Sequence, residues 1–264
     1  MTLRLAIAGA KGRMGQILTQ EVLSSSDFVL GATFEKIEKT PSQQLLDAAD
    51  LAGTAVSTNN FNDVLANIDV LIDFSAPCAT LTYLDACVQH NVPMVIGTTG
   101  FSDIEKSIIQ KAASHIAIVL SPNFSIGINL ALKLLDLSAR TLGDDYQVEI
   151  VEAHHHHKID TPSGTALKMG EVIANALGRD FKKCAVYERQ TLHCARDPQS
   201  IGFSSIRAGD IVGEHSVWFV ENAERIEITH KANSRLAFAK GALRTARWIV
   251  SQPVGLYSMQ DVIG

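Results

Sequence analysis

Hydrophobic residues in the first half of the chain gather in short, nearly continuous runs that alternate with longer segments of mixed polarity. The runs that predict strands are Leu3–Ala8, Phe28–Phe34, Val70–Phe74, Met94–Ile96 and Ile116–Leu120. Strands that are apolar throughout are typical of parallel sheets covered on both faces. The segments that predict helices are Met14–Ser24, Ala79–His90 and Asp103–Ser114. This alternation predicts an α/β domain with a Rossmann-like, doubly wound parallel sheet.

The pattern changes after about residue 121. An apolar segment predicts a helix at Ile126–Leu142, followed by a strand at Tyr146–Ala153 and a helix at Thr165–Leu177. Three closely spaced strands are then expected at Gly202–Arg207, Gly213–Val220 and Arg225–His230. Because short consecutive strands favour antiparallel neighbours, this half predicts a second, α+β domain with a mixed sheet.

The last predicted helix, Leu236–Val250, ends near Pro253 and is expected to return to the first domain. We therefore expect a dinucleotide-binding domain at residues 1–125, completed by residues 236–264. Residues 126–235 would form the domain for substrate binding and oligomerisation.

A glycine-rich turn lies between the first predicted strand and the first predicted helix. Gly9, Gly12 and Gly15 have the spacing G-x-x-G-x-x-G, a weak motif by itself. In this position, glycines let the backbone approach a pyrophosphate at a helix N-terminus. Glu35 ends the second strand, where an acid binds the ribose hydroxyls of a dinucleotide. Lys36, with Lys11 and Arg13, would tolerate a 2′-phosphate.

Composition and charge narrow the class of protein. The 264 residues are 46% hydrophobic and 19% charged, as in globular proteins, and the formal net charge is −5. This charge gives no basic surface for nucleic acid, and an anionic substrate would need a local cation. No apolar segment approaches the roughly 20 residues that span a bilayer. The four cysteines form no CxxC pair, so we expect reduced thiols in a cytoplasmic protein that binds neither membrane nor nucleic acid.

Four consecutive histidines, His154 to His157, are the most unusual feature. An expression tag would be terminal, and this run is embedded. If the strand continued through the run, alternate histidines would face opposite sides, so four zinc ligands could not converge. We therefore expect no metal here. One or two of the histidines would be structural, and the sequence does not decide between His156 and His157.

The residues after the histidines predict an anion site. Ser163, Gly164 and Thr165 precede an apolar helix, and a helix start offers hydroxyl and backbone N–H donors to a carboxylate. Such a site is worth only about 0.3–1 kcal/mol when exposed, so Lys158 would supply a full positive charge. A histidine is the natural proton donor near neutral pH. Together these residues predict a pocket that holds a small carboxylate and protonates it beside a hydride donor.

These residues also carry a family resemblance. The segment Glu152-Ala-His-His-His-His-Lys-Ile-Asp-Thr-Pro-Ser-Gly-Thr-Ala166 resembles the signature of the 4-hydroxy-tetrahydrodipicolinate (dihydrodipicolinate) reductase family of bacterial lysine and diaminopimelate synthesis. The likeness extends over essentially the whole chain, through Ile7–Gly15, Val95–Phe101, Asn123–Gly127, Arg207–His215 and Thr229–Ala232. The resemblance implies reduction of 4-hydroxy-tetrahydrodipicolinate with NADH or NADPH, and commonly a homotetramer built through the second domain's sheet.

The resemblance also implies roles for individual residues. His154 would be the proton donor and Lys158 its catalytic partner. The groups expected to bind the carboxylates of a small dicarboxylate substrate are His155, Lys158, Ser163, Gly164 and Thr165. The residues expected to line the cofactor are Gly9, Ala10, Lys11, Gly12, Arg13, Met14, Glu35, Lys36, Gly97, Thr98, Thr99, Ser121, Pro122, Asn123 and Phe124.

Two positions depart from the family pattern. Some relatives have arginine where this chain has Lys36 and Ala76. The absence of these arginines argues against a strong preference of this chain for NADPH. Lys11 replaces a common glycine and can compensate, so we expect use of both cofactors. Two other classes stay open at this point: another Rossmann-type amino-acid dehydrogenase, and a cofactor-sensing protein without catalysis.

Overall fold

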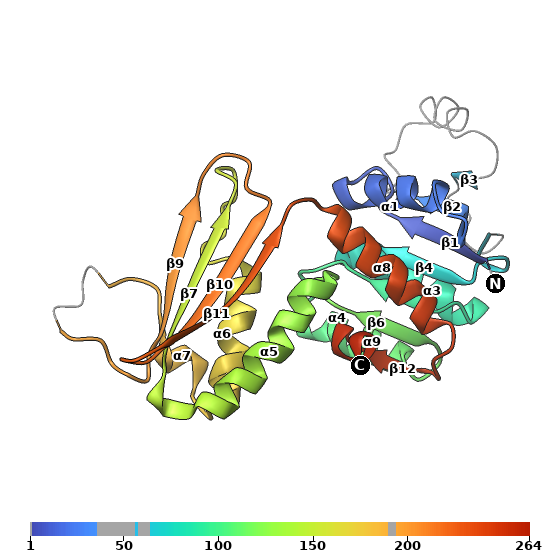
Figure 1. Cartoon of the computed structure of the whole chain (residues 1–264). Helices are drawn as coiled ribbons and strands as arrows, with labels where there is room; N and C mark the ends of the chain where they lie inside the picture. The colour runs from blue at the N-terminus through green and yellow to red at the C-terminus, as the bar shows by residue number, and fades with distance from the viewer. Residues whose placement is uncertain (1, 36–55, 58–63, 190–193) are drawn as a thin grey trace. The chain divides into compact units, whose positions relative to one another are not determined.

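The computed structural model describes residues 2–35, 56–57, 64–189 and 194–264. The chain forms two compact units, one of residues 1–126 with 236–264 and one of residues 127–235 (Figure 1). Each unit has its own sheet and its own hydrophobic core.

The first unit is built on a parallel sheet, which confirms the predicted fold class. Within the described residues the sheet has seven strands in the order β12-β6-β5-β4-β1-β2-β3, and all neighbouring strands are parallel. The strands are β1 (Leu3–Ala8), β2 (Phe28–Phe34), β3 (Val56–Ser57), β4 (Val70–Asp73), β5 (Met94–Ile96), β6 (Ala117–Leu120) and β12 (Gly255–Tyr257). The strand order reverses between β1 and β4, which is where ligands bind in open α/β sheets.

Helices cover both faces of this sheet, as apolar strands require. The helices are α1 (Arg13–Leu23), α3 (Pro77–His90), α4 (Asp103–Ala112), α8 (Leu236–Ile249) and α9 (Met259–Ile263). On β1, Leu5 and Ile7 pack in a core cluster with α1 and α8, whereas Ala6 and Ala8 pack in a second cluster with α3 and α4. Alternate residues of one strand therefore contribute to two cores.

The second unit has a mixed sheet with one helical layer, as predicted. Its strands are β7 (Gln147–His154), β8 (Ala185–Val186), β9 (Ile201–Arg207), β10 (Gly213–Val220) and β11 (Arg225–Ala232), in the order β11-β10-β7-β9-β8. Its helical segments are α5 (Ile126–Leu142), the 3-10 turn η1 (Gly143–Asp145), α6 (Gly164–Ala176) and α7 (Phe181–Cys184). Residues of α5 and α6 share one core with the inward residues of β7 and β10.

One expectation about this sheet was wrong. Antiparallel pairing of consecutive strands holds for β10 and β11. It fails for β9 and β10, because β7 lies between them and pairs with β9 in parallel. This arrangement brings the carboxyl end of β7 beside the carboxyl end of β9, with His154 opposite Arg207.

Candidate active site

The end of β7 places two polar side chains on the core face of the sheet. Val148 and Ile150 are buried on this face, and Glu152 and His154 continue the same alternation with 1% and 8% exposure. β7 ends at His154, so the three following histidines lie in a turn and strand alternation does not orient them.

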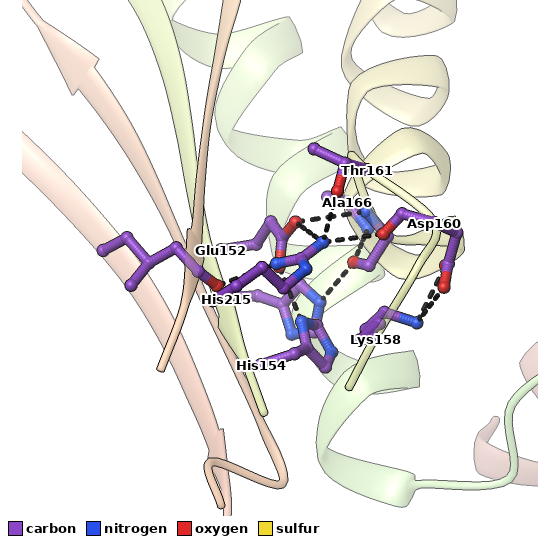
Figure 2. A network of polar contacts seen from close by, with 10 residues as sticks. Glu152, His154, Lys158, Asp160, Thr161, Ala166 and His215 are labelled. Carbon is purple, nitrogen blue, oxygen red and sulfur yellow. Dashed lines mark hydrogen bonds and ion pairs between the residues drawn. The ribbon is translucent and has the colours of Figure 1, made fainter. Parts of the chain in front are cut away.

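Glu152 is held by an arginine from the neighbouring strand (Figure 2). Arg207 Nη1 and Nη2 donate to the two carboxylate oxygens of Glu152 at 2.9 and 2.7 Å. Burial opposes ionisation of Glu152, but hydrogen bonds from Arg207, Ser205 and His154 outweigh it and lower the pKa of Glu152 to about 2. Glu152 is therefore a carboxylate throughout the neutral pH range.

His154 is oriented by this carboxylate. Its Nδ1 lies 2.6 Å from Glu152 Oε2. An ionised carboxylate only accepts hydrogen bonds, so the network assigns a proton to Nδ1 and leaves Nε2 as the nitrogen for proton exchange. Nε2 faces Gly213, where an added Cβ would lie 3.0 Å away. The absence of a side chain at Gly213 keeps the space next to Nε2 open.

His215 lies beside His154 on the neighbouring strand β10. The two rings meet edge to face, with centroids 5.1 Å apart. His215 Nε2 lies 3.0 Å from Ser163 Oγ. Burial, followed by the charge of His154, lowers the pKa of His215 to about 4, so this ring is neutral at physiological pH.

Ser163 caps helix α6, as its position before the helix predicts. Its hydroxyl accepts from Ala166 N at 3.3 Å, and its backbone N–H donates to Glu152 Oε1 at 3.3 Å. The side chain is 2% exposed and also contacts His215. The hydroxyl of Ser163 is thus engaged in contacts within the protein. Gly164 and Thr165 form the first turn of the helix.

Lys158 lies in the loop between β7 and α6. Its Nζ donates to Asp160 Oδ1 at 2.8 Å, and the hydrogen bond from Lys158 lowers the pKa of Asp160. The direct side-chain partner of Lys158 is therefore Asp160.

The other histidines of the run differ in their surroundings. His156 donates through its backbone N–H to Gly209 O at 3.1 Å, and its Nδ1 lies 2.9 Å from the same oxygen. His156 thereby ties the turn after β7 to the turn between β9 and β10. His155 is half-buried, and burial followed by the charge of Arg235 lowers its pKa. His157 is exposed, and its ring contacts that of His156 at a tilt of 43°, with centroids 3.7 Å apart.

Sequence reasoning did not single out Glu152, Arg207 or His215 as functional residues. A signal was present in the strand pattern, because Glu152 and His215 occupy positions whose neighbours two residues away are apolar and inward-facing. A carboxylate at an inward position requires a buried partner. The identity of that partner depends on the β7–β9 register.

The glycine turn of the first unit fits a dinucleotide. Gly9 has φ +75°, and a Cβ on Gly15 would lie 2.1 Å from Gly9 O, so both positions require glycine. Gly12 is the N-cap of α1, and neither a capping side chain nor an acidic residue occupies this helix start. Glu35 follows β2 and accepts a hydrogen bond from the backbone N–H of Lys11. This turn is preformed to receive an anion.

The two other predicted cofactor loops follow β5 and β6. The buried Thr98 accepts a hydrogen bond from Ser75 N at 3.0 Å. Ser121 donates to Asn123 O at 2.9 Å. Phe124 is 1% exposed and packs against Phe74, so this predicted ligand can contribute only backbone atoms. Lys36, another predicted cofactor residue, lies outside the described residues.

No group of three or more His, Cys, Asp or Glu side chains in the described ranges is placed to hold a metal ion. No helix in that part of the chain combines the length and the apolar character needed to cross a membrane.

A nucleotide-type glycine turn at the switch point of a parallel sheet, and a buried carboxylate–histidine pair beside a helix N-terminus, together define a Rossmann-type oxidoreductase. Comparison with known proteins narrows this class. The profile described as "Dihydrodipicolinate reductase, N-terminus" matches residues 3–124, and "Dihydrodipicolinate reductase, C-terminus" matches residues 127–263. The chain therefore belongs to the dihydrodipicolinate reductase family.

Relatives and solved structures agree with this assignment. A 4-hydroxy-tetrahydrodipicolinate reductase of Laribacter hongkongensis is 53% identical over 99% of this chain and 98% of its own length. One of Methylococcus capsulatus is 50% identical over 100% of this chain and 99% of its own. A dipicolinate-bound dihydrodipicolinate reductase from Paenisporosarcina has a TM-score of 0.79 at 27% identity, covering 99% of both chains. A diaminopimelate dehydrogenase of C. glutamicum has a TM-score of 0.58 at 13% identity over 100% of this chain and 96% of its own, and shares the fold alone.

Proposed function

We propose that this chain catalyses the NAD(P)H-dependent reduction of 4-hydroxy-tetrahydrodipicolinate to tetrahydrodipicolinate in lysine and diaminopimelate biosynthesis. The observation that carries the proposal is the Glu152–His154 pair at 2.6 Å, next to the start of α6, in a chain of this family. Loss of water from the 4-hydroxy substrate leaves a conjugated imine, and its reduction needs one hydride and one proton.

The hydride would come from a reduced nicotinamide, which supplies both electrons when it is bound. Residues Gly9 to Met14 would hold its pyrophosphate at the start of α1, and Glu35 its adenosine ribose. The loops Gly97–Thr99 and Ser121–Phe124 follow β5 and β6 and would complete the site. The requirement for glycine at Gly9 and Gly15 supports this assignment, because a Cβ at either position would clash with backbone atoms and displace the turn.

The substrate carboxylates would bind at the start of α6. The helix N-terminus attracts an anion, and its first turn has no acidic residue. Gly164 and Thr165 would donate hydrogen bonds from this turn to a substrate carboxylate. His155 and Ser163 would lie beside them. Lys158 would exchange its ion pair with Asp160 for a substrate carboxylate. That exchange keeps the charge of Lys158 paired before and after binding.

His154 would donate the proton from its Nε2. Because Glu152 holds Nδ1–H, the imidazole presents one defined nitrogen to the substrate. A positioned general acid contributes roughly 10²–10⁴ to the rate.

Replacement of His154 by Gln tests this role. We expect kcat to fall by at least about a hundredfold and KM to change much less, because the lost interaction forms during proton transfer. His156→Gln is the matched control, since His156 belongs to the same run but contacts the Gly209 turn. Equal and small changes in kcat and KM for His154→Gln would reject its role as acid. A substrate panel that includes 2-amino acids separates this activity from that of an amino-acid dehydrogenase.

Both NADH and NADPH should serve as reductants. Glu35 favours a free ribose, whereas Lys11 and Arg13 favour a 2′-phosphate. Initial rates with each cofactor at matched concentrations measure the preference. A ratio of kcat/KM above about 100, equal to about 2.7 kcal/mol, would contradict use of both.

We further propose that the enzyme is a cytoplasmic homotetramer. The four free cysteines fit a reducing compartment. The outer face of the five-stranded sheet leaves Ile206 48% exposed beside the half-buried Val151, which supports association through this face. Sedimentation velocity should give a tetramer for the native chain and a smaller species for Ile206→Asp. A monomeric native chain would contradict the proposal.

A further inference from the structure

We propose that Glu152 and Arg207 act together as positioning residues. Glu152 fixes one tautomer of His154, and Arg207 holds Glu152 and the loop between β7 and α6 in fixed positions. This inference rests on the proposed role of His154 and adds two residues that neither touch the hydride donor nor carry the proton. The contacts that support the inference converge on the buried carboxylate of Glu152 (Figure 2).

Four hydrogen bonds at defined atoms converge on the Glu152 carboxylate, in addition to the one from the Ser205 side chain. Oε2 accepts from His154 Nδ1 at 2.6 Å and from Arg207 Nη1 at 2.9 Å. Oε1 accepts from Arg207 Nη2 at 2.7 Å and from Ser163 N at 3.3 Å. The carboxylate therefore joins the proposed acid, the strand β9 and the N-cap of α6. A shift of Glu152 would move all three.

Arg207 extends this linkage to the loop that carries Lys158. Its Nη2 donates to Asp160 O at 2.7 Å and to Thr161 Oγ1 at 3.2 Å. The same guanidinium thus anchors the carboxylate behind His154 and the loop before Ser163. Arg207 therefore links this loop to the proposed acid through Glu152, which binds both Arg207 and His154.

Glu152 orients His154 and does not relay its proton. With a pKa of about 2, Glu152 stays ionised at any pH at which the enzyme works. A buried ion pair by itself is weak evidence for stability, because desolvation offsets the Coulomb attraction. The consequence of the Glu152–Arg207 ion pair here is a fixed position of the carboxylate next to His154. In serine proteases, a buried aspartate likewise holds the catalytic histidine in one tautomer without becoming protonated.

The charges around His154 fix the direction of the expected pH effect. Glu152 faces it from β7, Arg207 from β9 and His215 from β10, and Lys158 and His155 lie in the segment that follows β7. Replacing Glu152 by Gln removes the one anion among these groups and leaves the Arg207 cation unpaired. The protonated form of His154 then becomes less favourable. Since a general acid must be protonated to act, the high-pH limb of kcat moves to lower pH.

The experiment compares Glu152→Gln with the matched control Glu149→Gln. Glu149 lies on the same strand and pairs with Arg189 at 2.8 Å and Arg196 at 3.1 Å, but it does not contact His154. We measure imidazole ¹⁵N spectra, with His154 assigned by difference from His154→Gln, and pH profiles of kcat. For Glu152→Gln we expect a mixture of tautomers, a kcat at least about tenfold lower, a high-pH limb at lower pH, and a nucleotide KM changed less than about threefold. Glu149→Gln should keep the native tautomer and pH profile.

A double variant separates the two positioning residues. Glu152→Gln with Arg207→Gln removes the unpaired cation, so the high-pH limb should return toward that of the native enzyme. The tautomers should stay mixed and kcat should stay low, because an amide at position 152 can accept from Nδ1–H or donate to a bare Nδ1 and so selects neither tautomer. If Glu152→Gln fails to fold by circular dichroism, Glu152→Asp takes its place, with the same changes expected in smaller degree.

The inference is overturned if the folded Glu152 variant keeps a single Nδ1–H tautomer and the native pH limb. The ¹⁵N spectra need no turnover, so they decide the tautomer even if His154 is not the acid. An active His154→Gln variant would overturn the proposed role of His154 as the acid and leave the tautomer result standing.

Discussion

The buried imidazole of His215 makes a quantitative prediction about acid stability. His215 is 4% exposed, and burial lowers its pKa from 6.5 to about 4. Below pH 6.5 the unfolded chain binds a proton at this position, whereas the folded chain does not until about pH 4. The unfolded state then holds more protons, so stability falls as pH falls through this window.

The size of the loss follows from the two pKa values. Each unit of pKa shift corresponds to about 1.36 kcal/mol, so the whole shift is worth about 3 kcal/mol below pH 4. Between pH 7 and pH 5 the loss from His215 alone is about 2 kcal/mol. Glu152 does not contribute in this interval, because its lowered pKa withdraws stability only as pH falls from about 4.5 toward 2.

Replacement of His215 by Gln removes this titration and leaves a donor near Ser163. Unfolding of residues 127–235 can be followed in urea through Trp218, in a Trp248→Phe background that removes the other tryptophan of the chain. We expect the difference in unfolding free energy between pH 7 and pH 5 to shrink by about 2 kcal/mol. His157→Gln replaces an exposed histidine of the same unit and is the control. An unchanged pH dependence in His215→Gln would refute the reasoning.

Two glycine substitutions test the two parts of the site separately. Gly15→Ala places a Cβ 2.1 Å from Gly9 O, so we expect a loss of about 1–3 kcal/mol in stability and a rise in nucleotide KM, measured by thermal unfolding and initial rates. An unchanged nucleotide KM would contradict the assignment of this turn. Gly213→Ala places a Cβ 3.0 Å from His154 Nε2, so substrate kcat/KM should fall at least about tenfold with an unchanged nucleotide KM. Native kcat/KM in this variant would show that Nε2 does not face the substrate.

Local patterns were sufficient to predict most of the fold. The apolar runs of the first half located β1, β2 and β5 at their observed bounds, because strands buried on both faces leave a continuous apolar signal. Ser102 directly precedes the predicted helix Asp103–Ser114, and it forms a capping box with Glu105. These features depend on residues close together in the sequence.

Features that depend on distant residues were missed. β12 has three residues and becomes a strand by pairing with β6, more than a hundred residues earlier in the chain. The contacts of the candidate site have the same origin. Glu152 meets His215 and Arg207 only through the pairing of β7 with β10 and β9. The sequence could place Ser163 at a helix start, but the partner of its hydroxyl, His215, comes from another strand.

One coupled assay tests the central claim most directly. 4-Hydroxy-tetrahydrodipicolinate is generated in the assay mixture from pyruvate and aspartate semialdehyde by the aldol-forming enzyme. The loss of absorbance of the reduced nicotinamide is then followed, once with NADH and once with NADPH. We predict oxidation of either cofactor that depends on both precursors and falls at least about a hundredfold in His154→Gln. Oxidation no faster than without precursors, or equally fast in His154→Gln, would contradict the account.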